Sequence, residues 1–580
     1  MIEIPSQSSL ARPREWITAH TAELICSVVL VVMALNYFAV ISRKTLTNDE
    51  NYHVPAGYYH LVFGNFQVNP EHPPLVKMIS ALPLVLLRPI APTPTINPAE
   101  NPIVQGHGAF LAFWQANPQR LEAIAFWARV PMIALSLLFG FFLFTYARYL
   151  GGPIAAICSV VMFSLEPTVL AHGRVVQTDM PAAFAYLLFF FALQLFFQDP
   201  SLRRSILLGI TAGLALVTKF SLLIVLPVFV GALSVMAWRS LKNETRRTSV
   251  KLGSAILSLL VVVNLAYYFE RSPLLPANRE EVITAWPAHT TAVARGFDAV
   301  STIVPPAYLF GAFVVNLHND LGHYASIIGK YSRTVWWYYF PLAFALKTSI
   351  PFLLISTVSF VWAVWSVIRD RQCQLAIPIL ASVLYTTSSM ASNINIGVRH
   401  FLPVMGILFL LGGVFLAQLW DRYRRFALII ILVSFSWMAF EALRAFPNYI
   451  PYTNQFARSH PQWYYLSDSN VEWGDDTNQL AEYLRDRGET KVRAALPGGW
   501  LSKIEYGIDY INPFVIDEPI EHTRYIAIGA SYLNGSTVPL IHDRAGRPIT
   551  DERRRNFFAA YRDRKPEAVF GNSIYLFRED

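Results

Sequence analysis

Long apolar segments recur through the first three quarters of this chain and constrain its fold more than any other feature. They cover residues 26–41, 130–146, 184–197, 207–238, 252–268, 341–367 and 426–440. A helix needs about 20 such residues to cross a membrane, and one soluble core could not bury so many. Only 15% of the 580 residues are charged, against about 25% in ordinary soluble domains. The sequence therefore predicts an α-helical polytopic membrane protein, and we count about eleven spans.

The apolar stretch 205–238 is too long for one helix across a hydrocarbon core about 30 Å thick. Its interruption is Thr218-Lys219-Phe220-Ser221. We therefore expect two shorter spans with Lys219 in the turn between them. Taken alone, Lys219 also fits a lysine that extends from a helix end toward water.

Basic residues gather in every second loop between the apolar segments. The clusters are Arg12 and Arg14, Arg148, Arg203 and Arg204, the stretch 242–251, Arg369 and Arg371, and Arg422, Arg424 and Arg425. Loops rich in Lys and Arg face the cytoplasm, which predicts a cytoplasmic N-terminus. The two long loops, 42–120 and 270–340, then lie outside. Topology explains these clusters, so we predict no nucleic-acid partner.

The composition changes near Pro447, where charged residues become frequent. Residues 492–496, 525–528 and 573–577 are typical of short strands, and 478–487 has helical spacing. We expect a transmembrane domain over 1–446 and an extracytoplasmic α/β domain over 447–580. In the first outer loop, the apolar stretch 75–87 follows two prolines, which helix starts tolerate, and predicts a helix at the membrane surface.

An aromatic run, Trp336-Trp337-Tyr338-Tyr339-Phe340, closes the second outer loop. Trp and Tyr are enriched where a membrane meets water. The run is compatible with such an interfacial belt and with direct contact to a lipid ligand, and the two interpretations do not exclude each other.

Acidic residues adjoin the apolar segments on the predicted outer side. Asp49 and Glu50 follow the first segment, and Asp179 precedes another. Carboxylates beside a bilayer are costly unless they are solvated, paired or used. Asp179 alone fits an acid at a helix start, where the dipole favours the ionised form. Several acids together with Lys, His and Arg on one side indicate a functional site.

Transfer of a sugar from a phosphate leaving group needs a base for the acceptor hydroxyl and positive charge or a metal at the phosphate. Asp49 and Glu50 are candidates for the base. The candidate phosphate partners are Lys77, Lys219 and Arg399. Carboxylate and imidazole ligands for a divalent metal are available from Glu71, His72, Asp179 and one of His318 and His323. Both of these last histidines also fit ordinary polar loop residues.

Several motifs occur in a recognisable order. They are Asp49-Glu50, Glu71-His72-Pro73-Pro74-Leu75, Thr178-Asp179-Met180-Pro181, Thr218-Lys219-Phe220-Ser221, and the stretches 336–348 and 466–476. This order resembles the GT-C membrane glycosyltransferases, in particular the phospholipid-carrier-dependent branch related to protein O-mannosyltransferases and to the aminoarabinose transferase of lipid A. The last motif departs from the family pattern at Glu472 and Asp475, where that pattern has Asp and Gln.

The resemblance implies a polyprenyl-phosphate-linked hexose or pentose as donor and inverting transfer to a protein, lipid or envelope-glycan acceptor at the inner membrane. It implies that Asp49 is the catalytic base, with Glu50 in support. Glu71 and Asp179 would sit at the donor phosphate, either directly or through a metal, beside the three cations. The residue types alone make Glu71, Asp179, His72 and His323 the candidate ligands of such a divalent metal.

A lipid-linked donor also follows from topology, because nucleotide sugars are cytoplasmic whereas the predicted acidic site lies outside. Two alternatives remain open from the sequence. One is a transporter or flippase for the lipid-linked sugar, although transporters usually have ionisable residues near the midplane and internal symmetry. The other is a catalytically inactive membrane scaffold whose C-terminal domain binds partners.

Overall fold

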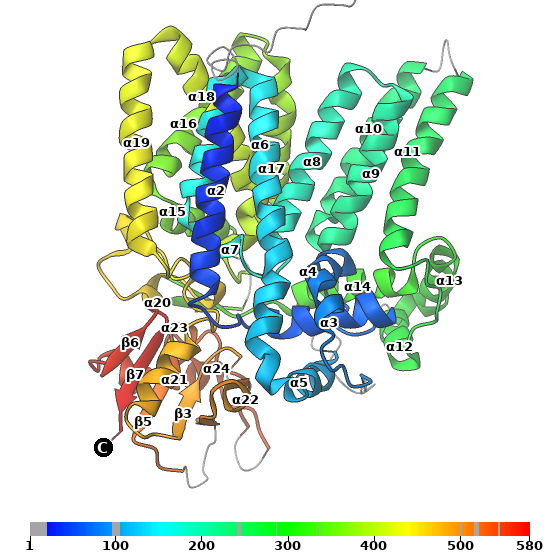
Figure 1. Cartoon of the computed structure of the whole chain (residues 1–580). Coiled ribbons are helices and arrows are strands. Elements are labelled where there is room, and N and C mark those ends of the chain that lie inside the picture. The colour runs from blue at the N-terminus through cyan, green and yellow to red at the C-terminus, as the bar shows by residue number, and fades with distance from the viewer. Residues whose placement is uncertain are drawn as a thin grey trace, which may run out of the picture.

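The computed structural model describes residues 20–94, 105–240, 245–285, 287–333, 336–498, 501–514, 521–542 and 546–579. Long helices run side by side in one layer, and short helices and a small sheet form a second layer below their ends (Figure 1). The predicted helical membrane protein with an α/β C-terminal part is confirmed. Arg12, Arg14 and the first part of the basic stretch 242–251 lie outside the described residues.

Nine helical segments in the described ranges are long and apolar enough to cross a membrane. Their main helices are α2 (Thr21–Ile41), α6 (Leu121–Leu165), α8 (Asp179–Gln198), α10 (Val225–Ser240), α11 (Thr245–Ala266), α16 (Ile350–Arg369), α17 (Ala376–Met390), α18 (Leu402–Arg422) and α19 (Arg424–Ala445). The chain is therefore a multi-pass membrane protein.

Helix α6 folds back on itself at Gly151 and Gly152. The φ of Gly152 is +75°, a left-handed conformation that suits glycine. The rings of Phe139 and Phe163 are 5.0 Å apart, whereas 24 residues along a straight helix would separate them by about 36 Å. The two arms are thus antiparallel. Counting both arms, and adding the 17-residue helix α9 (Leu202–Thr218) beside α11, the nine segments become the eleven passes expected from the sequence.

The predicted interruption of the long apolar stretch is present. Helix α9 ends at Thr218, Lys219 adopts an extended backbone, and a short 3-10 turn, η3 (Phe220–Ile224), leads into α10. Lys219 therefore lies at the end of the bundle that faces the lower layer.

The lower layer under the bundle is built mainly from the two long loops, and α7 joins it from the shorter connection between α6 and α8. It holds α3 (Glu50–Phe63), α4 (Pro74–Leu87), α5 (His107–Gln115), α7 (Pro167–His172), α12 (Pro276–Thr284), α13 (Thr290–Ser301), α14 (Pro306–Leu321), the antiparallel strands β1 (Ala325–Ile327) and β2 (Lys330–Ser332), and α15 (Tyr339–Lys347). The helix predicted over 75–87 is α4. Its Leu86 is 88% exposed, as suits a helix that meets lipid.

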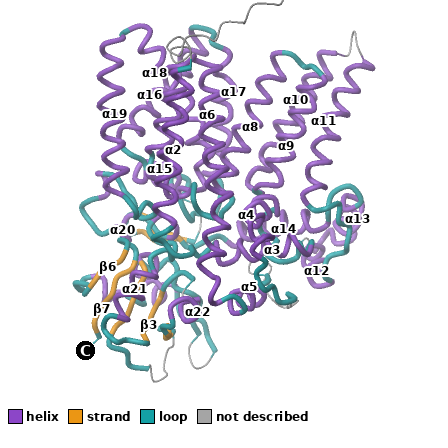
Figure 2. Tube along the Cα trace, viewed as in Figure 1, coloured by secondary structure: helices purple, strands orange, loops and turns teal. Residues whose placement is uncertain are grey.

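The C-terminal part contains a small sheet, drawn in orange in Figure 2. Its five strands have the order β4-β3-β5-β7-β6. The first three strands are parallel, and β7 is antiparallel to both neighbours. The elements are α20 (Gln462–Tyr465), α21 (Thr477–Arg485), β3 (Lys491–Ala495), α22 (Ser502–Tyr506), β4 (Asp509–Ile511), β5 (Tyr525–Gly529), α23 (Ala530–Leu533), α24 (Asp551–Arg555), α25 (Ala559–Arg562), β6 (Ala568–Phe570) and β7 (Ile574–Arg578). The three predicted strands are confirmed, and the three-residue strands β4 and β6 were missed.

The segment 466–476 precedes the strands of this sheet and packs against the helical part. Lys347 Nζ donates to the carbonyls of Ile450 and Asn470, at 2.6 Å each. Asn470 Oδ1 accepts the N–H of Val398 at 2.9 Å. These bonds fix the C-terminal segment beside the short turn η6 (Val398–Phe401), which carries Arg399.

The aromatic run at 336–340 is divided between surface and core. Trp337 is exposed, whereas Tyr339 and Phe340 are buried. The hydroxyl of Tyr339 accepts a hydrogen bond from Asn470 Nδ2 at 2.9 Å. An interfacial belt therefore describes Trp337 but not Tyr339 or Phe340.

We predict that Gly413→Ala destabilises the bundle at the contact of α18 with the second arm of α6. A Cβ at Gly413 would lie 2.5 Å from the carbonyl oxygen of Ala155, and overpacking of this kind typically costs about 1–3 kcal/mol. Thermal unfolding in detergent should show a lower midpoint. Gly231→Ala in α10 is the control, because nothing lies within 4 Å of its Cβ position. Equal midpoints for the two variants would contradict close packing at Gly413.

Candidate active site

A cavity of about 1080 Å³ lies where the bundle, the lower layer and the C-terminal part meet. Its wall includes the starts of α3 and α8, the turn at Lys219, the turn at Arg399 and the segment 468–473. Eight of the candidate residues border it. They are Asp49, Glu71, His72, Asp179, Lys219, His318, His323 and Arg399. Segments far apart in sequence thus converge on one space.

Asp49 presents a carboxylate to this cavity from the start of α3. Arg399 Nη1 donates to Asp49 Oδ2 at 2.6 Å, and Trp473 Nε1 donates to Oδ1 at 3.3 Å. The Arg399 guanidinium also lies over the Trp473 ring, 4.2 Å from its centre, a cation–π geometry. The Asp49 side chain remains 21% exposed. A carboxylate has about four lone-pair positions, so Asp49 can still accept a proton from a ligand.

Asp179 lies deeper and is surrounded by positive groups. Its carboxylate forms an ion pair with Lys219 and lies 3.6 Å from Arg399 Nη1 and 4.0 Å from His400 Nε2. Its side chain is only 3% exposed. Gln177 Oε1 accepts the backbone N–H of Asp179 at 2.6 Å and fixes the helix start. Asp179 therefore orients two cations.

Lys219 and Arg399 keep hydrogen-bonding capacity for a further anion. Of the contacts between described residues, the Lys219 ammonium makes one side-chain bond, to Asp179, out of three donors. Arg399 Nε is buried and has no partner within the described residues. Two carboxylates and two cations balance in charge. A phosphate can thus engage unused donors without displacing Asp49 or Asp179.

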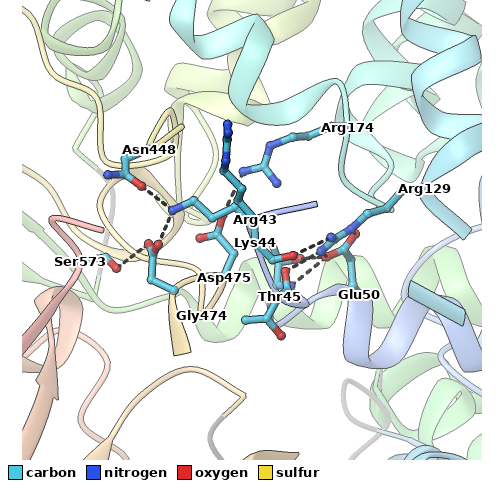
Figure 3. A network of polar contacts seen from close by, with 12 residues as sticks. Arg43, Lys44, Thr45, Glu50, Arg129, Arg174, Asn448, Gly474, Asp475 and Ser573 are labelled. Atoms are coloured by element: carbon cyan, nitrogen blue, oxygen red, sulfur yellow. Dashed lines mark hydrogen bonds and ion pairs between the residues drawn. The ribbon is translucent and has the colours of Figure 1, made fainter. Parts of the chain in front are cut away.

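Glu50 does not border the cavity, although it is next to Asp49 in sequence. Arg129 Nε donates to Glu50 Oε1 at 2.7 Å and Nη2 donates to Oε2 at 2.6 Å, a bidentate pair (Figure 3). The backbone N–H groups of Thr47 and Val176 donate to the same carboxylate at 2.8 and 3.0 Å. Glu50 ties the segment before Asp49 to α6 and to the loop before Asp179, so it positions the site.

Lys77 is likewise outside the cavity, contrary to the predicted phosphate contact. Its ammonium donates to Asn69 O at 2.8 Å, Asn69 Oδ1 at 3.0 Å and His72 O at 2.8 Å. All three of its donors are thus used. Burial lowers the pKa of Lys77 well below its usual range. Its role in this arrangement is to hold the loop that carries Glu71 and His72.

A second group of buried ion pairs fastens the C-terminal segment to the loop before Asp49 (Figure 3). Lys44 pairs with Asp476, and its Nζ also donates to Asn448 Oδ1 at 2.6 Å. Arg174 Nη2 donates to Asp475 Oδ2 at 2.9 Å. The backbone N–H of Asn48 donates to the Trp473 carbonyl at 2.7 Å. Because these bonds are next to Asp49 and Trp473, they bring the two side chains together.

Two carboxylate–imidazole pairs form another part of the cavity wall. Glu71 Oε1 lies 2.6 Å from His318 Nδ1, and Asp468 Oδ2 lies 3.6 Å from His323 Nε2. Burial opposes the charge on His318, but the bond to Glu71 and the charges of Glu71 and Asp468 outweigh it and raise its pKa. Burial lowers the pKa of His53 to about 4 and that of His72 well below its usual range, so these two rings are neutral at pH 7.

The predicted metal ligands are not assembled around one point. Within the described residues, no three side chains of His, Cys, Asp or Glu converge closely enough to hold an ion. Glu71 pairs with His318, Asp179 with Lys219, and His323 with Asp468. An Asp179 already bonded to cations does not suit a metal ligand, so this set does not fit a divalent ion in the observed arrangement.

Sequence reasoning assigned no role to three further residues that border the cavity: Asp468, Glu472 and Trp473. All three belong to the motif at 466–476, and that motif was the signal available for them. Trp473 reaches Asp49 across 424 residues of chain, and no local sequence pattern predicts such a contact.

Apolar side chains also line the cavity. They are Phe220, Leu223, Ala312, Val315, Phe340, Ile394 and Ile396. Phe220 directly follows Lys219 in the chain, so this apolar wall adjoins one of the cations.

Comparison with known proteins finds one family model that matches part of the bundle. Residues 121–268 match the model described as dolichyl-phosphate-mannose-protein mannosyltransferase, which agrees with the resemblance predicted from the sequence over that segment. The matched segment covers all of α6, together with Asp179 and Lys219. No curated protein sequence matches the chain significantly.

Two solved structures resemble this chain at low sequence identity. The chain is 14% identical to ArnT from Cupriavidus metallidurans bound to undecaprenyl phosphate, with a TM-score of 0.45, covering 76% of this chain and 72% of that one. It is 12% identical to the oligosaccharyltransferase AglB from Archaeoglobus fulgidus in complex with an inhibitory peptide and a dolichol-phosphate. In that case the TM-score is 0.45, covering 89% of this chain and 70% of that one.

We predict that Glu50→Gln destabilises the protein strongly. The change leaves the Arg129 guanidinium buried without its counter-charge, and breaking such a buried pair typically costs about 3–5 kcal/mol. Thermal unfolding in detergent should show the loss. Asp298→Asn is the control, since Asp298 pairs with Arg279 at the surface, where an ion pair contributes about 0–1 kcal/mol. Equal unfolding midpoints for Glu50→Gln and the control would refute a stabilising role of the Glu50–Arg129 pair.

We also predict that His318→Gln lowers stability at acid pH more than at alkaline pH. Because its pKa is raised in the folded state, His318 stabilises the protein fully below its unfolded pKa of about 6.5. This contribution disappears as the pH rises through the folded pKa. Unfolding midpoints of variant and wild type should differ at pH 5.5 and converge by pH 8.5. His289→Gln at the exposed start of α13 is the control. If the difference in unfolding midpoint between wild type and His318→Gln grew as the pH rose, the prediction would be wrong.

Proposed function

We propose that this protein is an integral membrane glycosyltransferase that moves a sugar from a polyprenyl-phosphate donor to an acceptor hydroxyl. One observation carries the proposal: the partly exposed carboxylate of Asp49 shares a cavity with the unused donors of Lys219 and Arg399. The family model that matches residues 121–268 is described as dolichyl-phosphate-mannose-protein mannosyltransferase, and a lipid-phosphate-linked sugar donor agrees with this description.

The donor phosphate binds to Lys219 and Arg399 in this proposal. Both side chains border the cavity, and charged hydrogen bonds to a phosphate are about twice as strong as neutral ones. The isoprenoid chain lies along the apolar wall that includes Leu223 and Phe340. Asp179 keeps both cations in place, so its role is to position them.

The reaction then proceeds by displacement at the anomeric carbon. The acceptor oxygen forms a bond to this carbon on the face opposite the phosphate, which inverts the configuration. The bond between the anomeric carbon and the phosphate oxygen breaks, and its electron pair stays on polyprenyl phosphate. Asp49 takes the acceptor proton as general base, while Lys219 and Arg399 stabilise the charge that develops on the leaving phosphate.

The orientation follows from the positive-inside rule. Arg148 lies in α6 just before its turn at Gly151, Arg203 at the start of α9, Arg371 between α16 and α17, and Arg424 at the start of α19. These turns lie at the end of the bundle opposite the C-terminal part (Figure 1), and Arg residues in such turns face the cytoplasm. We therefore infer that the cavity and the C-terminal part are extracytoplasmic, at the inner membrane. A hexose or a pentose is compatible with this cavity.

We predict that Asp49→Asn abolishes most transfer without unfolding the protein. Loss of a general base reduces the rate by about 10²–10⁴-fold. Purified protein in lipid vesicles should be given a panel of polyprenyl-phosphate sugars and membrane extract, and product mass should be measured. The matched control is Asp421→Asn, at the opposite end of α18.

Wild-type turnover by Asp49→Asn would refute the proposed base. A wild-type protein that moves the lipid-linked sugar across the vesicle membrane but forms no product would instead identify a flippase. A wild type that neither moves nor transfers any donor would indicate a scaffold.

A further inference from the structure

The carboxyl ends of three parallel strands open into the cavity. The chain runs from β3 to β4 on one side and then to β5 on the other. In open sheets, ligands bind outside the carboxyl ends of strands at such a switch point. The residues that follow these strands, namely Leu496, Pro497, Gly498, Asn512, Ser531 and Tyr532, all border the cavity. The sheet therefore forms a wall that the proposed donor chemistry does not use.

A buried carboxyl group with an unused oxygen lies at this wall. Glu472 is 1% exposed, and its Oε2 accepts the N–H of Ser531 at 3.1 Å. Its Oε1 has no partner within the described residues. Gly529 makes the close approach possible, because a Cβ there would lie 1.9 Å from this oxygen. An unsatisfied buried oxygen costs free energy, which a ligand hydroxyl can recover.

These surroundings favour the neutral form of the Glu472 carboxyl group. Burial raises its pKa well above the usual range, and the charges of Asp468, Asp476 and Asp475 add to this effect. A neutral carboxyl group both donates and accepts hydrogen bonds. Such a group suits a ligand hydroxyl, which also donates and accepts hydrogen bonds. It carries no negative charge that would attract a cation.

Tyr510 supplies a second unused polar atom at the same wall. It lies in β4, its hydroxyl is buried, and this hydroxyl has no partner within the described residues. The nearby rings of Phe514 and Tyr532 have centres 5.7 Å apart and border the cavity. They offer apolar faces against which the carbon skeleton of a sugar can pack.

Positive charge is absent from this wall, as far as the chain is described. Among the described lining residues, those from 494 to 537 include no Lys, Arg or His. The cations that border the cavity, Lys219 and Arg399, belong to its other end. A phosphorylated ligand would lie beside Asp468 with no counter-charge from the sheet, and burying such a charge unpaired is costly.

We propose that the carboxyl ends of β3, β4 and β5 form an acceptor subsite for a neutral, hydroxyl-rich ligand such as a glycan chain, with Glu472 and Tyr510 as its hydrogen-bonding groups. This inference rests on the proposed function and restricts the class of acceptor. The subsite disfavours a phosphate group such as that of lipid A. The subsite adjoins Asp49 through Trp473 and Asn48. A hydroxyl of the bound ligand can therefore reach the base.

The test measures binding separately from turnover. Full-length protein in lipid nanodiscs is titrated with mannotriose, with cellotriose and with mannose 6-phosphate, and binding is followed by saturation-transfer NMR. We expect at least one neutral trisaccharide to bind and the sugar phosphate not to compete for this wall. Tyr510→Phe should weaken binding by about three- to tenfold, the value of one neutral hydrogen bond, with an unchanged unfolding midpoint because that hydroxyl has no protein partner.

Two further variants separate recognition from folding. Glu472→Gln keeps the size of the side chain and a neutral donor and acceptor, so it should bind like wild type, whereas Glu472→Ala should lose binding. Tyr483→Phe is the control outside the cavity, since its hydroxyl contacts Glu567 at the surface. Equal trisaccharide binding by wild type, Tyr510→Phe and Glu472→Ala, or no binding by wild type, would overturn the subsite.

Transfer assays on the same variants distinguish the two proposals. Transfer with an acceptor KM that Tyr510→Phe leaves unchanged would reject the subsite and keep the glycosyltransferase. Trisaccharide binding that depends on Tyr510, without transfer from any polyprenyl-phosphate sugar, would keep the subsite and reject the glycosyltransferase.

Discussion

The buried bond between Glu50 and Arg129 is the constraint on which the rest of the site depends. It joins the start of α3, helix α6 and the loop that leads into α8, and these elements carry or adjoin Asp49 and Asp179. Arg129 Nη2 also donates to the Thr45 carbonyl at 2.6 Å. With several donors on one carboxylate, the pair is fully satisfied, and this is the condition under which buried charge is tolerated. Loss of either partner would release three segments at once.

The C-terminal part is an integral wall of this site. Asp475 and Asp476 fasten the segment 466–476 through Arg174 and Lys44, and Trp473 then reaches Asp49. The contacts of Glu472 and Asp475 explain why these two residues differ from the family pattern. Asp475 is half of a buried ion pair, and an uncharged Gln could not neutralise Arg174. Glu472 extends one methylene further than Asp toward the end of β5, into the space left by Gly529.

Sequence patterns predicted the spans, the break at Lys219 and the main strands, because apolar length and local alternation determine them. They also identified most of the ionisable groups that border the cavity. They failed for Glu50 because consecutive residues of a helix point about 100° apart, so Asp49 and Glu50 cannot face one space. They failed for Lys77 because its acceptors are loop carbonyls, whose directions exist only once the chain is folded. Asp468 and Trp473 reach the site through long-range packing, which periodicity does not record.

Charge is separated along the cavity, and this separation gives its two ends different preferences. At the membrane end, Lys219 and Arg399 balance Asp179 and Asp49, so an anion added there meets unused donors and a net charge near zero. At the sheet end, carboxyl groups and hydroxyls occur without a described cation, so an anion meets only acceptors or acids. A lipid phosphate is therefore favoured beside the spans and a neutral hydroxyl beside the sheet. Asp49, fixed between the two ends by Arg399 and Trp473, adjoins both.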